Sequence, residues 1–254
     1  MRIGVLRTPK GRVFARLEGE SPRVGHLLDA APWLGGKPTG ETLSADGALL
    51  CPVMPSKIVC IGRNYAAHAK EMGADVPAEP MLFLKPPSAL LDPGGTVLCP
   101  PESAKVEHEA ELVVVLGKRA KRVAKEDALA YVFGYSAACD VTARDIQRKD
   151  VQFTRGKGFD TFCPIGPWVQ TELAYGSTRV QCRVNGVTKQ DGTTADMIFD
   201  VPTLVAYVSH MMTLEPGDVI LTGTPEGVGP LLPGDALEVE IGGLGVLKLG
   251  VGKG

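Results

Sequence analysis

The sequence predicts a β-rich α+β fold, and three observations support that assignment. The 254 residues are 44% hydrophobic and 22% charged, which is ordinary globular composition and enough chain to bury a sizeable core. The 31 glycines and 20 prolines exceed average usage and are spread between apolar runs, as expected for many turns. Short apolar runs, several rich in β-branched residues, recur along the chain, whereas helical patterns are few and short.

The first fifty residues predict a small N-terminal unit. Short strands are expected at Arg2–Leu6 and Arg12–Leu17, followed by a loose stretch containing Leu-Gly-Gly-Lys-Pro. The segment Cys-Pro-Val-Met-Pro at 51–55 precedes the apolar strand Lys57–Ile61, and its two prolines mark a boundary. We therefore expect a β-rich appendage over residues 1–51 and a main domain over residues 52–254.

A short helix is expected at Tyr65–Met72, capped by Asn64 and ended by Gly73 in the left-handed conformation. His68 and Glu71 are three residues apart and share one helical face. A carboxylate beside an imidazole can orient it and raise its basicity, as a general base requires, although such pairs are also common as surface contacts. A strand is then expected at 81–85, and a proline- and glycine-rich loop, without helix, at 86–95.

The run HEAELVVVL at 108–116 is rich in β-branched residues and predicts a strand that ends at Gly117. Its period of two places Glu109 and Glu111 on one face, together with Val113 and Val115. Two carboxylates that point into a β-rich core repel each other unless a cation lies between them. The alternative is an acidic, solvent-facing strand edge.

A third acid, Asp140, ends the expected strand 132–140, which follows an expected helix at 124–130. A helix at 142–149 comes next, with Thr142 and Asp145 at capping-box spacing. Capping alone can explain Asp140, but three carboxylates would favour Mg²⁺ or Mn²⁺, and less often Ca²⁺. Donors occur nearby, at Arg144, Gln147 and Lys157, and a lysine beside a metal would stabilise a developing oxyanion.

The C-terminal part predicts mostly strands. They are expected at 168–171, 180–184, 219–222, 236–241 and 246–251, with one helix that opens at Pro202 and continues to Met212. The loop TGTPEGVGP at 222–230 is glycine-dense, and its amides could form an anion-binding nest. A plain surface turn is the alternative, and the loop is not a P-loop because no Gly-Lys-Ser/Thr follows.

The charge and the cysteines indicate which partners and which cellular compartment to expect. The net charge is −2, with 27 basic and 29 acidic residues interleaved, so neither a nucleic-acid footprint nor an attraction to anionic membranes is indicated. The N-terminus lacks the apolar core of a secretory signal, and no apolar run could span a bilayer. We expect a cytoplasmic protein whose six cysteines, which include no C-x-x-C pair, are reduced and mostly buried.

Taken in order, these segments resemble the fumarylacetoacetate hydrolase family. The resemblance covers nearly all of residues 57–252, through seven blocks: KIVCIGRNYAAHAKEMG, MLFLKPPSALL, VEHEAELVVVLGKRA, GYSAACDVTARDIQ, GKGFDTFCPIGP, RVNGV and LTGTPEGVGP. It implies a mixed β-sandwich and β-roll around Mg²⁺ or Mn²⁺, and a homodimer. Glu109, Glu111 and Asp140 match the family's metal ligands.

The resemblance also implies roles for other residues. Lys157 matches the lysine beside the metal, and His68 with Glu71 falls where some members carry a catalytic dyad on a lid. The expected substrate-contacting positions are Arg63, Tyr65, Gln147, Lys157, Gly223 and Thr224. Only about 50 residues precede the first block, unlike the longer animal fumarylacetoacetases, so fumarylacetoacetate itself is a doubtful substrate.

By size, the expected activity is that of a 2-hydroxyhepta-2,4-diene-1,7-dioate isomerase or decarboxylase of aromatic catabolism. The alternatives are hydrolysis of an acylpyruvate and decarboxylation of oxaloacetate. All three act on small 2-oxo acids and share an enolate, so the metal site alone does not select among them. A different class of explanation is a non-catalytic module in which an ion ties β elements together, which predicts no open cleft.

Overall fold

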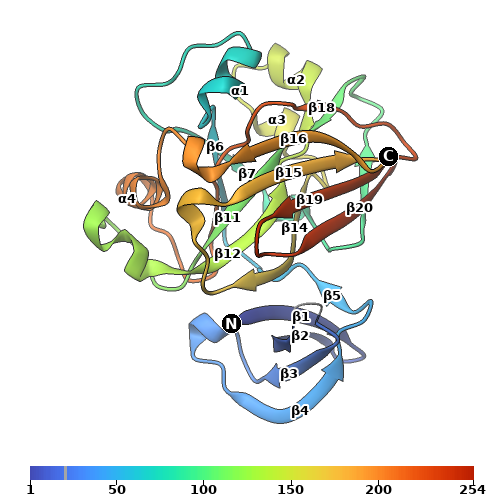
Figure 1. Cartoon of the computed structure of the whole chain (residues 1–254), viewed down its shortest axis with the longest axis vertical. Helices are drawn as coiled ribbons and strands as arrows, with labels where there is room; N and C mark the ends of the chain where they lie inside the picture. Colours follow the sequence, from blue (N-terminus) through green and yellow to red (C-terminus); the bar gives the residue numbers. More distant parts are fainter. Residues whose placement is uncertain (20–21) are drawn as a thin grey trace.

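Three β-sheets form the framework of the described residues, 1–19 and 22–254, in the computed structural model (Figure 1). The largest runs in the order β4-β3-β2-β1-β14-β12-β11-β17-β6-β7, with β5 beside β1 and β8 beside β14. Its strands are β1 Arg2–Thr8, β2 Gly11–Glu18, β3 Val24–Leu28, β4 Pro38–Ser44, β5 Leu49–Leu50, β6 Ile58–Gly62, β7 Met81–Lys85, β8 Leu90–Leu91, β11 Ala110–Leu116, β12 Val132–Cys139, β14 Cys163–Gln170 and β17 Val219–Leu221.

The other two sheets belong to the body of the molecule. A five-stranded sheet runs β16-β15-β19-β20-β9, and a small one runs β13-β10-β18. Their strands are β9 Thr96–Cys99, β10 Val106–His108, β13 Thr142–Ala143, β15 Arg179–Val184, β16 Val187–Thr193, β18 Gly229–Pro230, β19 Ala236–Ile241 and β20 Val246–Lys253. The prediction of a β-rich α+β fold is confirmed.

Helices are short. The α-helices are α1 Ala66–Glu71, α2 Arg144–Lys149, α3 Thr154–Lys157 and α4 Val201–Met211, and the 3-10 helices are η1 Pro32–Leu34, η2 Pro87–Ala89, η3 Lys125–Tyr131, η4 Tyr175–Ser177 and η5 Thr194–Asp196. Figure 1 shows α1, α2 and α3 gathered at one end of the body. The predicted opening of α4 is confirmed: Pro202 lies in its first turn, and the Asp200 carboxylate accepts a hydrogen bond from Thr203 N at 2.9 Å.

The five N-terminal strands form a lobe of their own below the body in Figure 1. β1 nevertheless pairs with β14, with Arg2 opposite Gln170, so the large sheet continues from the lobe into the body. Asp92 adds a second link, because its carboxylate accepts a hydrogen bond from Cys51 N at 2.8 Å and pairs with Arg12 at 3.1 Å. The lobe is therefore attached by both backbone and side-chain hydrogen bonds.

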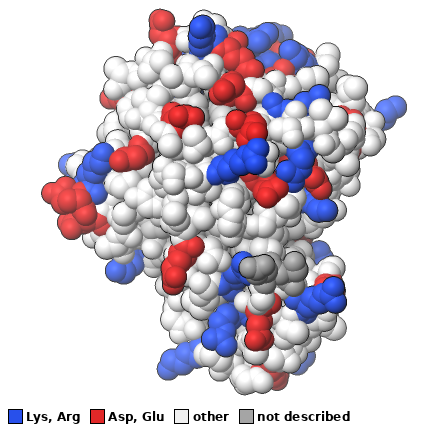
Figure 2. Space-filling view, viewed as in Figure 1, with Lys and Arg blue, Asp and Glu red and all other residues white. Residues whose placement is uncertain are grey.

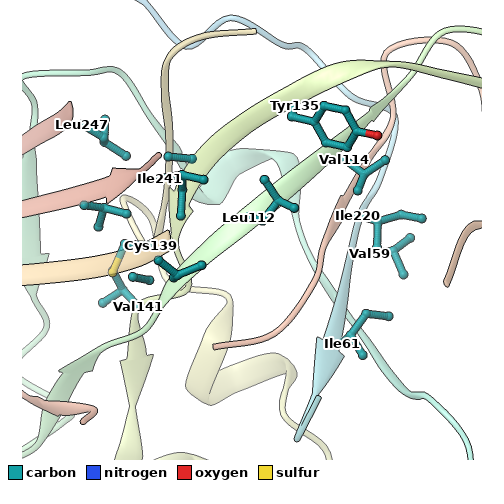
Figure 3. Packing of buried hydrophobic residues seen from close by; sticks show 14 of the residues in the cluster. Val59, Ile61, Leu112, Val114, Tyr135, Cys139, Val141, Ile220, Ile241 and Leu247 are labelled. Carbon is teal, nitrogen blue, oxygen red and sulfur yellow. The ribbon is translucent and has the colours of Figure 1, made fainter. Parts of the chain in front are cut away.

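The main core lies between the large and the five-stranded sheets, and Figure 3 shows part of it. Leu112 and Val114 of β11 pack there with Ile241 of β19. Val113 and Val115 point to the opposite face, where a second apolar cluster covers them. A strand segment buried against apolar clusters on both faces is itself apolar, which explains the continuous run from Leu112 to Leu116.

Several local predictions were wrong in their details. The expected helix 124–130 is the 3-10 helix η3, and the expected strand 108–116 is interrupted at Glu109, between β10 and β11. Asn64 does not cap α1: its amide instead donates to Phe199 O at 3.0 Å and Thr222 O at 2.8 Å. Thr142 lies in β13 and bonds the Asp140 carbonyl, so the capping box does not form. Asn64 thus bonds distant backbone groups in place of the helix end, whereas Thr142 bonds a carbonyl two residues before it.

In the part of the chain that the structure describes, no helix is long and apolar enough to cross a membrane. The six cysteines are free, and all but Cys99 are buried, as predicted. On the face shown in Figure 2, basic and acidic side chains are interspersed.

Candidate active site and metal centre

The three acids predicted as metal ligands lie together. One carboxylate oxygen of each of Glu109, Glu111 and Asp140 lies within 4.8 Å of the others, and all three residues are buried. Pairing of β11 with β12 places Ala110 opposite Cys139, and Asp140 N donates to Glu109 O at 2.8 Å. The antiparallel register thus brings together Glu111 of β11, Glu109 directly before β11 and Asp140 directly after β12.

Lys157 lies between two of these acids. Its Nζ is 2.7 Å from both Glu109 Oε2 and Asp140 Oδ2. Gly156 lets α3 approach α2, because a Cβ there would lie 2.8 Å from the backbone of Gln147. Burial disfavours the ammonium, but the charges of Asp140 and Glu109 outweigh it and raise the pKa of Lys157. Burial alone would raise the pKa of Glu109. The charges of Lys157 and Arg144 outweigh burial, so the pKa of Glu109 is lowered.

Two more buried cations surround the acids. Arg144 Nε donates to Glu107 Oε2 at 2.6 Å, and its Nη2 contacts Glu109 Oε1. Lys85 Nζ lies 2.5 Å from Asp140 Oδ1 and is fully buried. The sequence analysis missed Lys85 and Glu107. The only available signal for Lys85 was a lysine at the end of an otherwise apolar strand, which is rare unless the charge is paired.

Glu111 differs from the other acids because no cation lies within ion-pair distance of it among the described residues. Its Oε2 accepts a hydrogen bond from Gly223 N at 2.7 Å. Burial, and then the charges of Asp140 and Glu109, raise the pKa of Glu111 well above its ordinary value. Gly223 has φ 94°, and a Cβ there would lie 2.7 Å from Asn64 Cβ, so this position requires glycine.

The predicted His–Glu pair forms on α1. His68 Nδ1 is 3.2 Å from Glu71 Oε2, and His68 is 6% exposed. The other Glu71 oxygen accepts a hydrogen bond from Gly227 N at 3.0 Å. The pair is therefore held by the glycine-rich loop and is not merely a surface contact between neighbouring side chains.

A cavity of about 300 Å³ joins these groups. The predicted site residues that line it are Arg63, His68, Glu109, Glu111, Asp140, Gln147, Lys157 and Thr224. Glu71 and Gly223 bond to lining residues from behind. Arg144 and Arg148 also line the cavity, with an apolar side made of Met72, Met81, Phe83 and Phe153.

Two of the expected substrate-contacting residues, Thr224 and Gln147, make hydrogen bonds within the protein, and a third, Arg63, has a left-handed backbone conformation. The Thr224 hydroxyl donates to Ala110 O at 2.8 Å, and Gln147 Oε1 accepts from Arg144 Nη1 at 3.3 Å. Arg63 has φ 55°, a left-handed conformation that costs energy for a residue with a side chain. Tyr65 is buried, and its hydroxyl has no hydrogen-bond partner among the described residues.

Comparison with known proteins identifies the family. Residues 57–251 match the family described as Fumarylacetoacetate (FAA) hydrolase C-terminal. The chain belongs to this family. Oxaloacetate tautomerase YisK of Bacillus subtilis is 41% identical over 267 residues, which covers 97% of this chain and 88% of that one. A mitochondrial oxaloacetate decarboxylase of Dictyostelium discoideum is 48% identical over 195 residues, covering 74% and 89%.

Solved structures agree with this assignment. A 2-hydroxyhepta-2,4-diene-1,7-dioate isomerase from Mycobacterium marinum superposes with a TM-score of 0.92 at 38% identity, over 100% of this chain and 98% of that one. The predicted family and its β-rich fold are thereby confirmed, and the chain is an enzyme of the fumarylacetoacetate hydrolase family.

The site fits the divalent cation that membership in the fumarylacetoacetate hydrolase family implies. Three carboxylates offer the hard oxygen donors that Mg²⁺, Mn²⁺ and Ca²⁺ prefer. Glu111 is buried and has no countercharge among the described residues. A bound divalent ion would supply that countercharge.

Proposed function

We propose that this enzyme acts on oxaloacetate or a close 2-oxo dicarboxylate and catalyses its keto–enol tautomerisation, with Mg²⁺ or Mn²⁺ held by Glu109, Glu111 and Asp140. The relative named as an oxaloacetate tautomerase aligns with 97% of the chain, the N-terminal residues included. The expected dienedioate isomerase has weaker support, because it rests on structural neighbours of lower identity. The alternative expected from the sequence included oxaloacetate only as a substrate for decarboxylation. Oxaloacetate now replaces the dienedioate as the proposed substrate, and the relative named as a tautomerase supports tautomerisation as the reaction.

The observation that carries this proposal is the arrangement of charge around one cavity. The acid triad and Lys157 line it, together with Arg63, Arg144 and Arg148. A substrate with two carboxylates needs a cation for each of them. The metal site and the arginines together supply these charges, and the small volume favours a short diacid.

The chain's own residues suit a proton transfer. In tautomerisation the C3–H bond breaks and an O–H bond forms at the 2-oxo oxygen, so no co-reactant is needed. A bound divalent cation would act as a Lewis acid toward the 2-oxo group. Lys157 stabilises negative charge that develops there, and His68, oriented by Glu71, carries the proton at C3.

Decarboxylation of oxaloacetate is the second candidate, and the Dictyostelium relative supports it. In that reaction the C3–C4 bond breaks, CO₂ leaves and C3 takes up a proton to give pyruvate. The same residues would serve, since charge again develops on the 2-oxo oxygen. The two reactions differ in whether the substrate holds its C4 carboxylate in the plane of the developing enol.

Parallel assays test the proposal. The enzyme is treated with a chelator, restored with Mg²⁺ or Mn²⁺, and given oxaloacetate, an acylpyruvate or a 2-hydroxy-2,4-dienedioate. Enol absorbance reports tautomerisation, and coupled lactate dehydrogenase reports pyruvate. We expect metal-dependent tautomerisation of oxaloacetate to exceed the other activities. Faster turnover of the dienedioate would restore the isomerase hypothesis, and full activity with chelator would contradict the metal site.

The same hypothesis includes the organisation of the chain. Residues 1–51 form the appendage and residues 52–254 the catalytic domain, and the functional unit is a homodimer. The lobe of β1–β5 in Figure 1 supports the division, although β1 also pairs with β14. Light scattering of the intact protein tests the dimer, and a mass of one chain at assay concentration would contradict it.

A further inference from the structure

Gln190 stands out among the buried polar residues that the proposed reaction does not use. It lies on β16, the edge strand of the five-stranded sheet, and is fully buried although its neighbours Lys189 and Asp191 are exposed. Its side chain points from this sheet to the strand that carries Glu109 and Glu111. A buried carboxamide needs partners for two acceptor and two donor positions.

All four positions are used. Gln190 Oε1 accepts from Ala110 N at 2.9 Å and from His108 Nδ1 at 3.2 Å. Its Nε2 donates to Thr224 Oγ1 at 2.7 Å and to Pro225 O at 2.8 Å. Glutamate could accept the first two bonds but could not donate the other two when ionised, and methionine could make none of the four.

These bonds close a ring around Ala110, the residue between the two glutamates. Ala110 N donates to Gln190, Gln190 donates to Thr224, and the Thr224 hydroxyl donates back to Ala110 O at 2.8 Å. β17 pairs with β11 only at Val113–Val115, so at Ala110 side chains replace the neighbouring strand. The ring fixes the backbone from which both carboxylates project.

The strand that carries Gln190, β16, also packs against the glycine-rich loop at 222–230. A Cβ at Gly227 would lie 2.1 Å from Lys189 O, and one at Gly192 would lie 2.6 Å from Pro225, so the loop and β16 are in close backbone contact. Gly227 N in turn holds the Glu71 carboxylate, which orients His68. β16 therefore reaches the acid triad through Ala110 and the His–Glu pair through the loop.

We propose that Gln190 is a positioning residue that fixes the acid-bearing strand and the glycine-rich loop relative to each other. Its acceptor half holds the strand at Ala110 and so sets the two glutamates. Its donor half holds Thr224 and Pro225 and so sets the loop that carries Gly227. The catalytic part of this inference rests on the proposed function, whereas the structural part does not.

Two variants separate the contribution of the acceptor half of the Gln190 carboxamide from that of its donor half. Gln190→Met removes all four hydrogen bonds, and Gln190→Glu keeps the acceptor half and loses the donor half. Gln181→Met, on the adjacent strand β15 and partly exposed, is the matched control. We expect Gln190→Met to lower both kcat and Mn²⁺ affinity ~10–100-fold, the usual effect of removing groups behind a metal site. Gln190→Glu should lower kcat similarly, because its second oxygen repels the Pro225 carbonyl, but should weaken Mn²⁺ binding less than Gln190→Met does, because the acceptor half still holds Ala110.

Paramagnetic resonance of free Mn²⁺ gives the affinity, and hydrogen exchange of residues 222–230 reports the loop. Exchange at Gly227 should be faster in both Gln190 variants and unchanged in Gln181→Met. Wild-type Mn²⁺ affinity, kcat per folded molecule and loop exchange in Gln190→Met would overturn the proposal. If the wild-type enzyme does not turn over oxaloacetate, the proposed function fails, but Mn²⁺ binding and exchange still decide the role of Gln190.

Discussion

Replacing Lys157 by methionine should make the metal-free protein less stable and the metal site tighter. The Lys157 ammonium is buried and bridges Glu109 and Asp140, with both distances 2.7 Å. Methionine keeps most of the apolar stem of the side chain but leaves the two carboxylates without this cation. The ammonium also competes with any divalent ion for the same oxygens, so its loss should favour metal binding.

The expected changes in stability and in metal affinity can be estimated because the ion pairs of Lys157 are buried. Removing one partner of a buried ion pair costs ~3–5 kcal/mol, and proton uptake by the carboxylates keeps the loss near ~3 kcal/mol. A metal at 100 times its dissociation constant adds ~2.7 kcal/mol to stability. Because the metal supplies the missing countercharge, we expect Mn²⁺ to bind the variant at least tenfold more tightly, which is ~1.4 kcal/mol.

Urea unfolding in chelator and in Mn²⁺, with Mn²⁺ titration of the folded protein, measures both quantities. Lys105→Met is the control: Lys105 pairs with Glu107 at 3.0 Å but is 47% exposed, so its loss should cost ~0–1 kcal/mol in either condition. Catalysis should fall in Lys157→Met despite the tighter metal. Unchanged stability in chelator, or weaker Mn²⁺ binding, would refute this account of Lys157.

Three further predictions concern Glu111 and His68 in the proposed site and the buried Asp218 outside it. Glu111→Gln should abolish Mn²⁺ binding by titration yet change metal-free stability by less than ~1 kcal/mol, because burial and neighbouring acids already disfavour its charge; a large loss of stability would contradict this. His68→Ala should lower kcat ~10²–10⁴-fold at unchanged Mn²⁺ affinity, and wild-type kcat would exclude it as the proton carrier. Burial raises the pKa of Asp218, but hydrogen bonds led by that of Lys57 outweigh burial and lower it. Its stabilisation is therefore present above pH ~3.9, the unfolded pKa, and is lost as pH falls through the lower folded pKa. Asp218→Asn should destabilise by ~2–3 kcal/mol at neutral pH and flatten the acid side of the stability curve; a curve parallel to wild type would contradict this.

Local sequence patterns were sufficient to predict the acid-bearing strand. A period of two places Glu109 and Glu111 on one face, and the structure separates Val113 and Val115 from Leu112 in the same way. The interruption at Glu109 was not predictable, because it arises where side chains replace a strand partner at Ala110. Periodicity fixes the direction of side chains but not where pairing stops.

The groups that support the site come from distant positions and leave no local signal. Gln190 is 80 residues from Ala110, and Asn64 bonds Thr222 across 158 positions. Asn64 precedes α1 as a good capping residue would, yet its amide has buried backbone partners that outcompete the helix end. Sequence motifs identified the three acids and several other residues that line the cavity, but not Arg148 or the apolar residues there. The residues behind the lining depend on how the two sheets pack.

The pairing of buried charges explains why the acid triad suits a divalent ion rather than a fourth basic side chain. Glu107 pairs with Arg144, Glu109 with Arg144 and Lys157, and Asp140 with Lys157 and Lys85. Among the described residues Glu111 has only an amide donor, so its carboxylate is the one that a bound ion would allow to ionise. A side-chain cation there would make the site permanently occupied, whereas an exchangeable ion leaves open coordination positions. Those positions are what a 2-oxo acid requires, and Lys157 would then be released from sharing Asp140 to face the substrate.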